Sequence, residues 1–212
     1  NVLTPPTTHS VQMNFLIAGR DTTANAMSWC VYEIARHREV QVRLLEEIDE
    51  VLQGRMPTYE SYTKMPYLQN VILETLRLHP SVPFDAKQAQ KSCKLPDGTF
   101  VKAGQYVMYA IYASGRNPEI WGPDCLEFRP ERWEAMAKRP SAFVYPVFNA
   151  GPRLCLGQTM ALLEATMCLS ALYQKYTFEL MPGRKVTYAV TVTLPVKDGL
   201  WVKPVPRGVI HH

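Results

Sequence analysis

The sequence lacks the cysteine pattern of a disulfide framework or a zinc site. Among 212 residues there are only five cysteines, an odd number, and no pair has the C-x-x-C spacing. The cysteines are Cys30, Cys93, Cys125, Cys155 and Cys168. Such scattered cysteines favour a reducing compartment.

The chain also lacks the charge of a nucleic-acid-binding protein. Its formal net charge is only +4, and no run of basic residues is interleaved with aromatics, so we expect no nucleic-acid partner. No apolar run reaches the length of a transmembrane helix. Neither a repeat nor an interdomain linker is visible. With 47% hydrophobic residues, the chain is long enough for one sizeable core.

The hydrophobic pattern predicts a mainly α fold with small β-sheets. Helical periodicity is interrupted at residues 18–23, where a glycine and two threonines are locally unfavourable and favour a bulge. The helix over 156–175 is apolar on nearly every face, which predicts burial at the centre of the protein. The expected elements are helices over 9–37, 39–53, 64–78 and 156–175, a hairpin turn at 95–100, a strand over 106–110, a short helix after 118, an aperiodic loop over 122–146 and short strands within 187–204.

The most informative stretch is Phe148-Asn149-Ala150-Gly151-Pro152-Arg153-Leu154-Cys155-Leu156-Gly157. It places one cysteine on a glycine-bearing loop just before the last long helix. Arg153 and the helix N-terminus would both stabilise a thiolate, which is the form of cysteine that binds metals. The glycines let the backbone approach a large flat ligand, and Phe148 offers an aromatic face. A buried structural cysteine is the alternative, but it does not explain why Phe148, Gly151, Arg153 and Gly157 surround the cysteine at this spacing.

Two further motifs carry ionisable groups. Asp21 and Thr22, in Ala18-Gly19-Arg20-Asp21-Thr22-Thr23, place a carboxylate beside a hydroxyl, an arrangement suited to proton delivery. Glu74 and Arg77 share one helix face, which is normally the position of a weak surface pair. A kinked structural helix and a solvated ion pair are the alternatives for these two motifs.

These motifs, in this order, resemble the cytochrome P450 family. The resemblance implies that Cys155 is the axial thiolate ligand of haem b (iron protoporphyrin IX). Phe148, Gly151, Arg153 and Gly157 would then belong to the haem-binding loop, with Arg153 pairing a haem propionate.

The resemblance assigns the helix motif to the distal side of the haem. Ala18 and Gly19 would lie over the haem face. Asp21 and Thr22 would be the acid–alcohol pair that delivers protons to bound dioxygen.

The resemblance also assigns a buried glutamate–arginine–arginine network to Glu74, Arg77 and Arg132. This network would hold the loop around Arg132 beneath the haem, and it is tolerable in the interior only if fully paired. Lys87 stands where relatives place a second propionate partner. An ordinary solvated lysine is an equal alternative for it.

The implied activity is the insertion of one oxygen atom from dioxygen into an unactivated C–H bond. Electrons would come from NADPH through NADPH–cytochrome P450 reductase, at the cytoplasmic face of the endoplasmic reticulum membrane. Segments of the chain resemble the fatty-acid ω-hydroxylase branch known from plants and fungi, which implies a lipophilic substrate, a long-chain fatty acid hydroxylated at or near its terminal carbon. Val82, Phe84 and Leu194 are the candidate substrate contacts, and ordinary core residues would look the same. The segments that carry this resemblance are 18–22, 79–83, 95–99, 111–116 and 121–133.

By this resemblance, residues 1–212 form a single partial domain, the C-terminal haem-binding part of a longer enzyme. We expect the chain alone to be inactive. One alternative is a truncated product that binds haem weakly or not at all. Another is a haem-thiolate isomerase or a peroxide-using relative, and the presence of both Asp21 and Thr22 counts against it.

Overall fold

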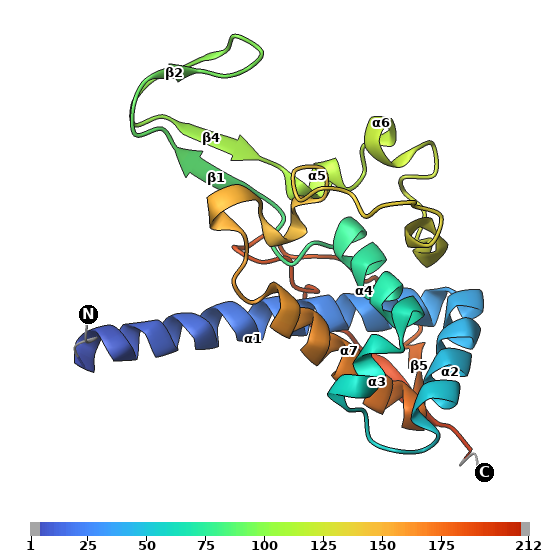
Figure 1. The fold of residues 1–212 in the computed structure, drawn as a ribbon. Coiled ribbons are helices and arrows are strands. Elements are labelled where there is room, and N and C mark those ends of the chain that lie inside the picture. The colour runs from blue at the N-terminus through green and yellow to red at the C-terminus, as the bar shows by residue number, and fades with distance from the viewer. Residues whose placement is uncertain (1–4, 209–212) are drawn as a thin grey trace.

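The structure is a computed structural model that describes residues 5–208 (Figure 1). Long helices dominate it, and three two-stranded antiparallel sheets lie at its periphery. The predicted class, mainly α with small β-sheets, is therefore confirmed. The helices are α1 (Pro5–Arg36), α2 (Arg38–Leu52), α3 (Tyr59–Thr63), α4 (Pro66–Leu78), α5 (Ile111–Ser114), α6 (Pro118–Trp121) and α7 (Gln158–Lys175), with the 3₁₀ turns η1 (Pro130–Trp133), η2 (Pro146–Phe148) and η3 (Gly151–Arg153).

The core lies where α1, α2, α4 and α7 pack against one another. In α2, Val40, Leu44 and Ile48 recur every four residues, so they form one apolar stripe, and all three are buried. Helix α4 begins at Pro66, a position where proline costs no hydrogen bond, and it is buried along most of its length.

The predicted interruption of the first helix is wrong. Helix α1 is continuous from Pro5 to Arg36, and the hydroxyl of Thr22 donates to the carbonyl of Ala18 at 2.7 Å within it. A hydroxyl can bond the carbonyl four residues back without breaking the helix, which accounts for the regular backbone at this motif.

Helix α7 is buried on one side in this chain and leaves apolar side chains exposed on its other faces. Its buried hydrophobic residues, Ala165, Leu169 and Tyr173, recur every four positions and face the other core helices. Met160 and Leu172, on its other faces, are 64% and 42% exposed.

Two of the sheets extend away from the helical core, whereas the third packs against α1 and α7 (Figure 1). Strand β1 (Asp85–Gln88) pairs with β4 (Tyr106–Tyr109), and β2 (Cys93–Lys94) pairs with β3 (Phe100–Val101) around the predicted turn. Strand β5 (Tyr176–Leu180) pairs with β6 (Val202–Pro206). Among residues 5–208, no helix is both long enough and apolar enough to cross a bilayer.

Candidate functional site

The cysteine motif forms a compact loop directly before α7. Its turns η2 and η3 bring the chain back on itself, so the backbone N–H of Cys155 donates to the carbonyl of Phe148 at 2.8 Å. Asn149 and Gly151 both have positive φ, 64° and 65°, a conformation that glycine and asparagine tolerate best. The loop therefore has one defined shape, with the cysteine at its end.

The side chain of Cys155 is exposed, unlike that of a structural cysteine. Cys30 shows the contrast, because burial raises the pKa of its thiol to about 12 and keeps it protonated. Gly157, the N-cap of α7, is close to the thiol, since a Cβ there would lie 3.9 Å from the Cys155 Sγ. The thiol thus sits at a helix N-terminus, where backbone N–H groups favour a negative charge.

The segment before the motif attaches the loop to the core. The hydroxyl of Tyr145 donates to the carbonyl of Leu73, in α4, at 2.6 Å. The Tyr145 ring also makes edge contacts with Trp121 and Trp133. The start of the loop is therefore fixed relative to α4.

Glu74, Arg77 and Arg132 are brought together by α4 and η1. Arg77 donates to both carboxylate oxygens of Glu74, at 2.9 and 2.8 Å, and Arg132 Nε donates to Glu74 Oε1 at 3.2 Å. Glu74 and Arg77 are wholly buried, and Arg132 is 5% exposed. Glu74 and Arg77 therefore form a buried ion pair and not a weak surface pair.

The network extends beyond the three residues that the motifs identify. Glu74 also accepts from the backbone N–H of Arg129 and from the indole N–H of Trp133, both at 3.0 Å. Arg132 makes a second ion pair with Asp124 at 3.2 Å. Burial disfavours the charged form of Arg132, but these bonds outweigh it, so its pKa is raised.

Backbone carbonyls complete the network around Arg77. Its guanidinium donates to the carbonyls of Gly115, Cys125 and Glu127 at 2.5, 2.6 and 2.9 Å. Gly115 lies so close that a Cβ there would sit 2.0 Å from the Arg77 carbonyl oxygen. The buried charges are thus fully paired, which is the condition for tolerating them in an interior.

The distal-helix residues lie on an open stretch of α1. Ala18, Gly19 and Asp21 are exposed, and a Cβ at Gly19 would meet nothing within 4 Å. Asp21 pairs only loosely with Arg20, at 3.6 Å. The carbonyl of Thr22 accepts from the hydroxyl of Ser81 at 2.7 Å. In the described residues, no hydrogen bond or ion pair links this stretch directly to the cysteine loop.

Lys87 is paired in this structure with a carboxylate. Its ammonium donates to Asp85 at 2.6 Å, and this hydrogen bond raises the pKa of Lys87. An ammonium has three donors, so one bond leaves two for another anion. Arg153 differs: it is exposed, and within residues 8–208 no hydrogen bond or ion pair engages its side chain.

Of the three candidate substrate contacts, two are at least partly exposed and one is buried. Val82 is half-buried and Phe84 is 39% exposed, just before β1. Leu194 is 1% exposed, and its carbonyl accepts from the Trp29 indole at 2.8 Å.

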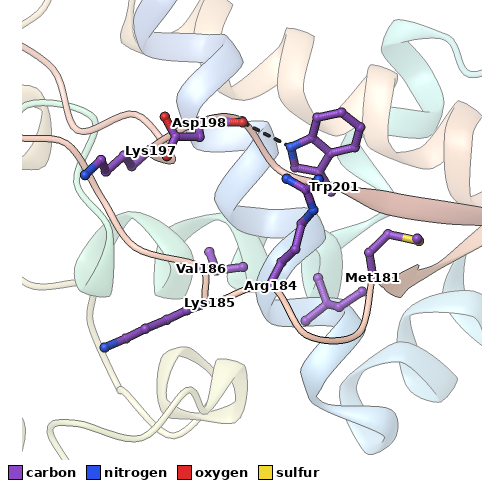
Figure 2. Close-up of a pocket in the computed structure, with 9 residues that line it drawn as sticks. Met181, Arg184, Lys185, Val186, Lys197, Asp198 and Trp201 are labelled. Carbon is purple, nitrogen blue, oxygen red and sulfur yellow. Dashed lines mark hydrogen bonds between the residues drawn. The ribbon is translucent and has the colours of Figure 1, made fainter.

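A small cavity elsewhere does not belong to the site. It measures about 160 Å³ and is formed by the loops beside β5 and β6, where Arg184 stacks 4.3 Å from the Trp201 ring. Figure 2 shows that Lys185 and Lys197 extend away from this ring. The cations do not converge on a common point, and none of the predicted site residues lines the cavity.

The cysteine loop fits a haem group. An exposed thiol is flanked in the sequence by exposed apolar side chains, with Leu154 at 50% and Leu156 at 86%, and by the exposed guanidinium of Arg153. A soft sulfur donor, an apolar surface and an exposed cation match the iron, the macrocycle and a propionate of haem, respectively.

Sequence reasoning missed several residues that shape this site. Asn149 within the cysteine loop donates to Asp85 and accepts from Tyr109, and Tyr145 anchors the segment before it. Asn149 lies inside the recognised motif, and Asp85 lies two residues before Lys87, but nothing in their spacing indicates that they meet.

The sequence is similar to those of known proteins along most of its length. The family model for Cytochrome P450 matches residues 3–198. Cytochrome P450 86B1 of Arabidopsis thaliana is 40% identical over 212 aligned residues, covering 93% of this chain and 38% of the relative. Cytochrome P450 CYP94D109 of Paris polyphylla is 41% identical, covering 91% of this chain and 41% of the relative.

A fungal relative matches to a similar extent. Cytochrome P450 52A6 of Candida tropicalis is 36% identical, over 90% of this chain and 40% of its own length. The chain spans about two fifths of the length of these curated relatives. Because the family model covers most of the chain, the chain belongs to the cytochrome P450 family.

Proposed function

We propose that this chain is the haem-binding, C-terminal part of a monooxygenase that hydroxylates a long-chain fatty acid at or near its terminal carbon. The exposed thiol of Cys155, at the end of a loop of defined shape and at the N-terminus of α7, is the observation that carries the proposal. The alternative of a structural cysteine would require a buried side chain.

The proposal gives each residue of the cysteine loop a task. Oxygen activation is the chemistry that a haem iron supplies when bound. Cys155 would bind the iron as a thiolate. Arg153 would pair a propionate with its exposed guanidinium, and Phe148 would contact the macrocycle, with Gly151 and Gly157 leaving space for its approach. Lys87 would reach the second propionate with its remaining donors.

On the distal side, the task is to hold and deliver a proton. The Thr22 hydroxyl donates to the Ala18 carbonyl, so its oxygen remains free to accept a hydrogen bond. It can pass a proton onward only by turning away from that carbonyl. The exposed carboxylate of Asp21 would then resupply the proton from solvent. Gly19, with open space around it, leaves room for a small ligand.

The reductase, the substrate and the location follow from the resemblance. Electrons would come from NADPH through NADPH–cytochrome P450 reductase, on the cytoplasmic face of the endoplasmic reticulum. Val82 and Phe84 would contact the aliphatic chain, and Leu194 would support them from the core. The similarity to the fatty-acid ω-hydroxylase branch supports the substrate class.

The rest of the enzyme would cover the surfaces that these residues leave open. Phe15, Leu16 and Ile17 on α1 are 59%, 65% and 63% exposed, and Leu156 on the cysteine loop is 86% exposed. Such patches favour association with another surface. We therefore expect the chain alone to bind haem poorly.

The test is turnover by the full-length, haem-loaded enzyme with NADPH, reductase and a series of fatty acids. We expect hydroxylated products near the terminal carbon, with the new oxygen derived from labelled dioxygen. Rearranged products without incorporated oxygen would instead indicate an isomerase. Turnover with peroxide in place of NADPH and reductase would indicate a peroxide-using enzyme.

A further inference from the structure

A polar cluster joins the cysteine loop to the sheet β1–β4. Asp85 in β1 lies directly opposite Tyr109 in β4, so both side chains come from one register position of the sheet. Asn149, far away in the sequence, reaches the same point from the cysteine loop. Figure 1 shows the loop that precedes α7 close to this end of the sheet.

The cluster is closed by short hydrogen bonds. The amide of Asn149 donates to Asp85 Oδ2 at 2.7 Å. The Tyr109 hydroxyl lies 2.9 Å from both Asp85 Oδ2 and Asn149 Oδ1, so its single proton is shared between two acceptors. The backbone N–H of Ala150 also donates to Asn149 Oδ1, at 2.9 Å. Both ends of the Asn149 amide are therefore engaged.

The electrostatics favour a charged carboxylate in this cluster. Burial by itself would raise the pKa of Asp85, but the hydrogen bonds from Lys87, Tyr109 and the Ala86 N–H outweigh it and lower the pKa. Burial and the bond to Asp85 raise the pKa of Tyr109, which keeps its hydroxyl protonated as a donor.

Asn149 directly follows Phe148, whose carbonyl accepts the hydrogen bond from the Cys155 N–H. Asn149 has a φ of 64°, which fixes the direction in which the chain leaves Phe148. The Phe148 carbonyl in turn accepts the Cys155 N–H at 2.8 Å. A shift of Asn149 would therefore move the acceptor that sets the backbone of Cys155.

We propose that Asp85, Tyr109 and Asn149 form a positioning clamp that holds the cysteine loop against the β1–β4 sheet and so fixes the orientation of the Cys155 thiolate toward haem. The claim about haem rests on the proposed function. The clamp itself is a property of the loop and can be measured without haem. The three residues act through the loop backbone and do not touch the reacting atoms.

The experiment uses the full-length protein in its haem-loaded and haem-free forms. Tyr109→Phe removes only the shared hydroxyl, and Asn149→Gly removes the amide while keeping a residue that tolerates positive φ. Tyr106→Phe is the matched control, because Tyr106 is on the same strand and is 67% exposed. The readouts are hydrogen exchange of the Ala150 and Cys155 amides, decay of the thiolate-ligated ferrous carbon-monoxide complex, and the midpoint of global unfolding.

We expect Tyr109→Phe to speed both amide exchange and decay of the thiolate complex about tenfold, with the global midpoint unchanged. Tyr106→Phe should match the wild type. The double variant should be no faster than Asn149→Gly alone, because both substitutions open the same clamp.

The clamp would be overturned if the Ala150 and Cys155 amides of Tyr109→Phe exchanged at the wild-type rate. It would also be overturned if the rate increases of the two single variants multiplied in the double variant. A change in exchange with an unchanged thiolate complex would overturn its role toward haem. If the wild type shows no thiolate complex at all, the proposed function fails, and amide exchange in the haem-free protein still decides whether the clamp exists.

Discussion

Replacing Glu74 by glutamine tests the buried network most directly. The substitution keeps the size of the side chain but removes the negative charge between Arg77 and Arg132. It also replaces one acceptor oxygen by an NH₂ donor. In the wild type, the two carboxylate oxygens accept five hydrogen bonds from N–H groups, so the new NH₂ would face other donors.

The expected loss of unfolding free energy follows from the burial of the network and the loss of its negative charge. Arg77 is 0% exposed, and in the variant it keeps backbone carbonyls and at most one neutral amide oxygen in place of the carboxylate. Breaking a buried pair by removing one partner typically costs about 3–5 kcal/mol. A domain of ordinary stability has about 5–15 kcal/mol in total, so the variant should lose a large part of it.

The assay is urea-induced unfolding of the full-length protein, followed by far-ultraviolet circular dichroism, with haem content measured in the same samples. Glu60→Gln is the matched control, since Glu60 pairs with Lys64 on a helix at 2.7 Å but is exposed. We expect Glu74→Gln to lower the midpoint strongly and to lose haem, and Glu60→Gln to leave both unchanged. Equal midpoints for the two variants would refute the reasoning.

Three other predictions concern a close contact, a proton path and pH. Gly115→Ala should destabilise the fold by about 1–3 kcal/mol in urea unfolding, because its Cβ would meet backbone atoms of Arg77. Thr22→Ala should lower the rate of product formation about 100-fold while oxygen consumption continues, measured with an oxygen electrode and product analysis. Burial lowers the pKa of His79 from 6.5, despite its bond to Glu33, so the unfolded state binds protons more readily there and stability should fall as pH drops below 6.5.

Each of these has a control within the chain. Gly208→Ala, where a Cβ meets nothing within 4 Å, should be neutral, and equal effects at both glycines would contradict the packing argument. Ser28→Ala removes a similar hydroxyl-to-carbonyl bond in α1, and a loss of product formation as large as that of Thr22→Ala would make the effect structural. His79→Gln should flatten the decline in unfolding free energy below pH 6.5, and an unchanged decline would assign it to other groups.

The sequence predicts most of the fold because its helices are strongly periodic. The boundaries of α2, α4 and α7 fall within two residues of the predicted ones. The interruption predicted at residues 18–23 fails because the preferences of single residues are weak, and the Thr22 hydroxyl finds an acceptor within the helix. The composition of α7 indicates an apolar helix but does not say which of its faces packs within this chain.

The same limit applies to the site. The spacing of Glu74 and Arg77 indicates a shared helix face, but their burial depends on carbonyls from residues 115–127, which no local pattern predicts. The pairing of Asp85 with Asn149 is similarly invisible, because it is created by the packing of a loop on a sheet. Local motifs therefore identify the groups that carry chemistry, and tertiary packing selects the residues that hold them in place.

The most direct test of the central claim is the carbon-monoxide difference spectrum of the reduced, full-length protein and of two cysteine variants. Cys168→Ala is the control, because this second cysteine is also exposed and lies on α7. We expect a strongly red-shifted Soret band in the wild type and in Cys168→Ala, and none in Cys155→Ala. A red-shifted band that survives Cys155→Ala would contradict the assignment of the thiolate ligand.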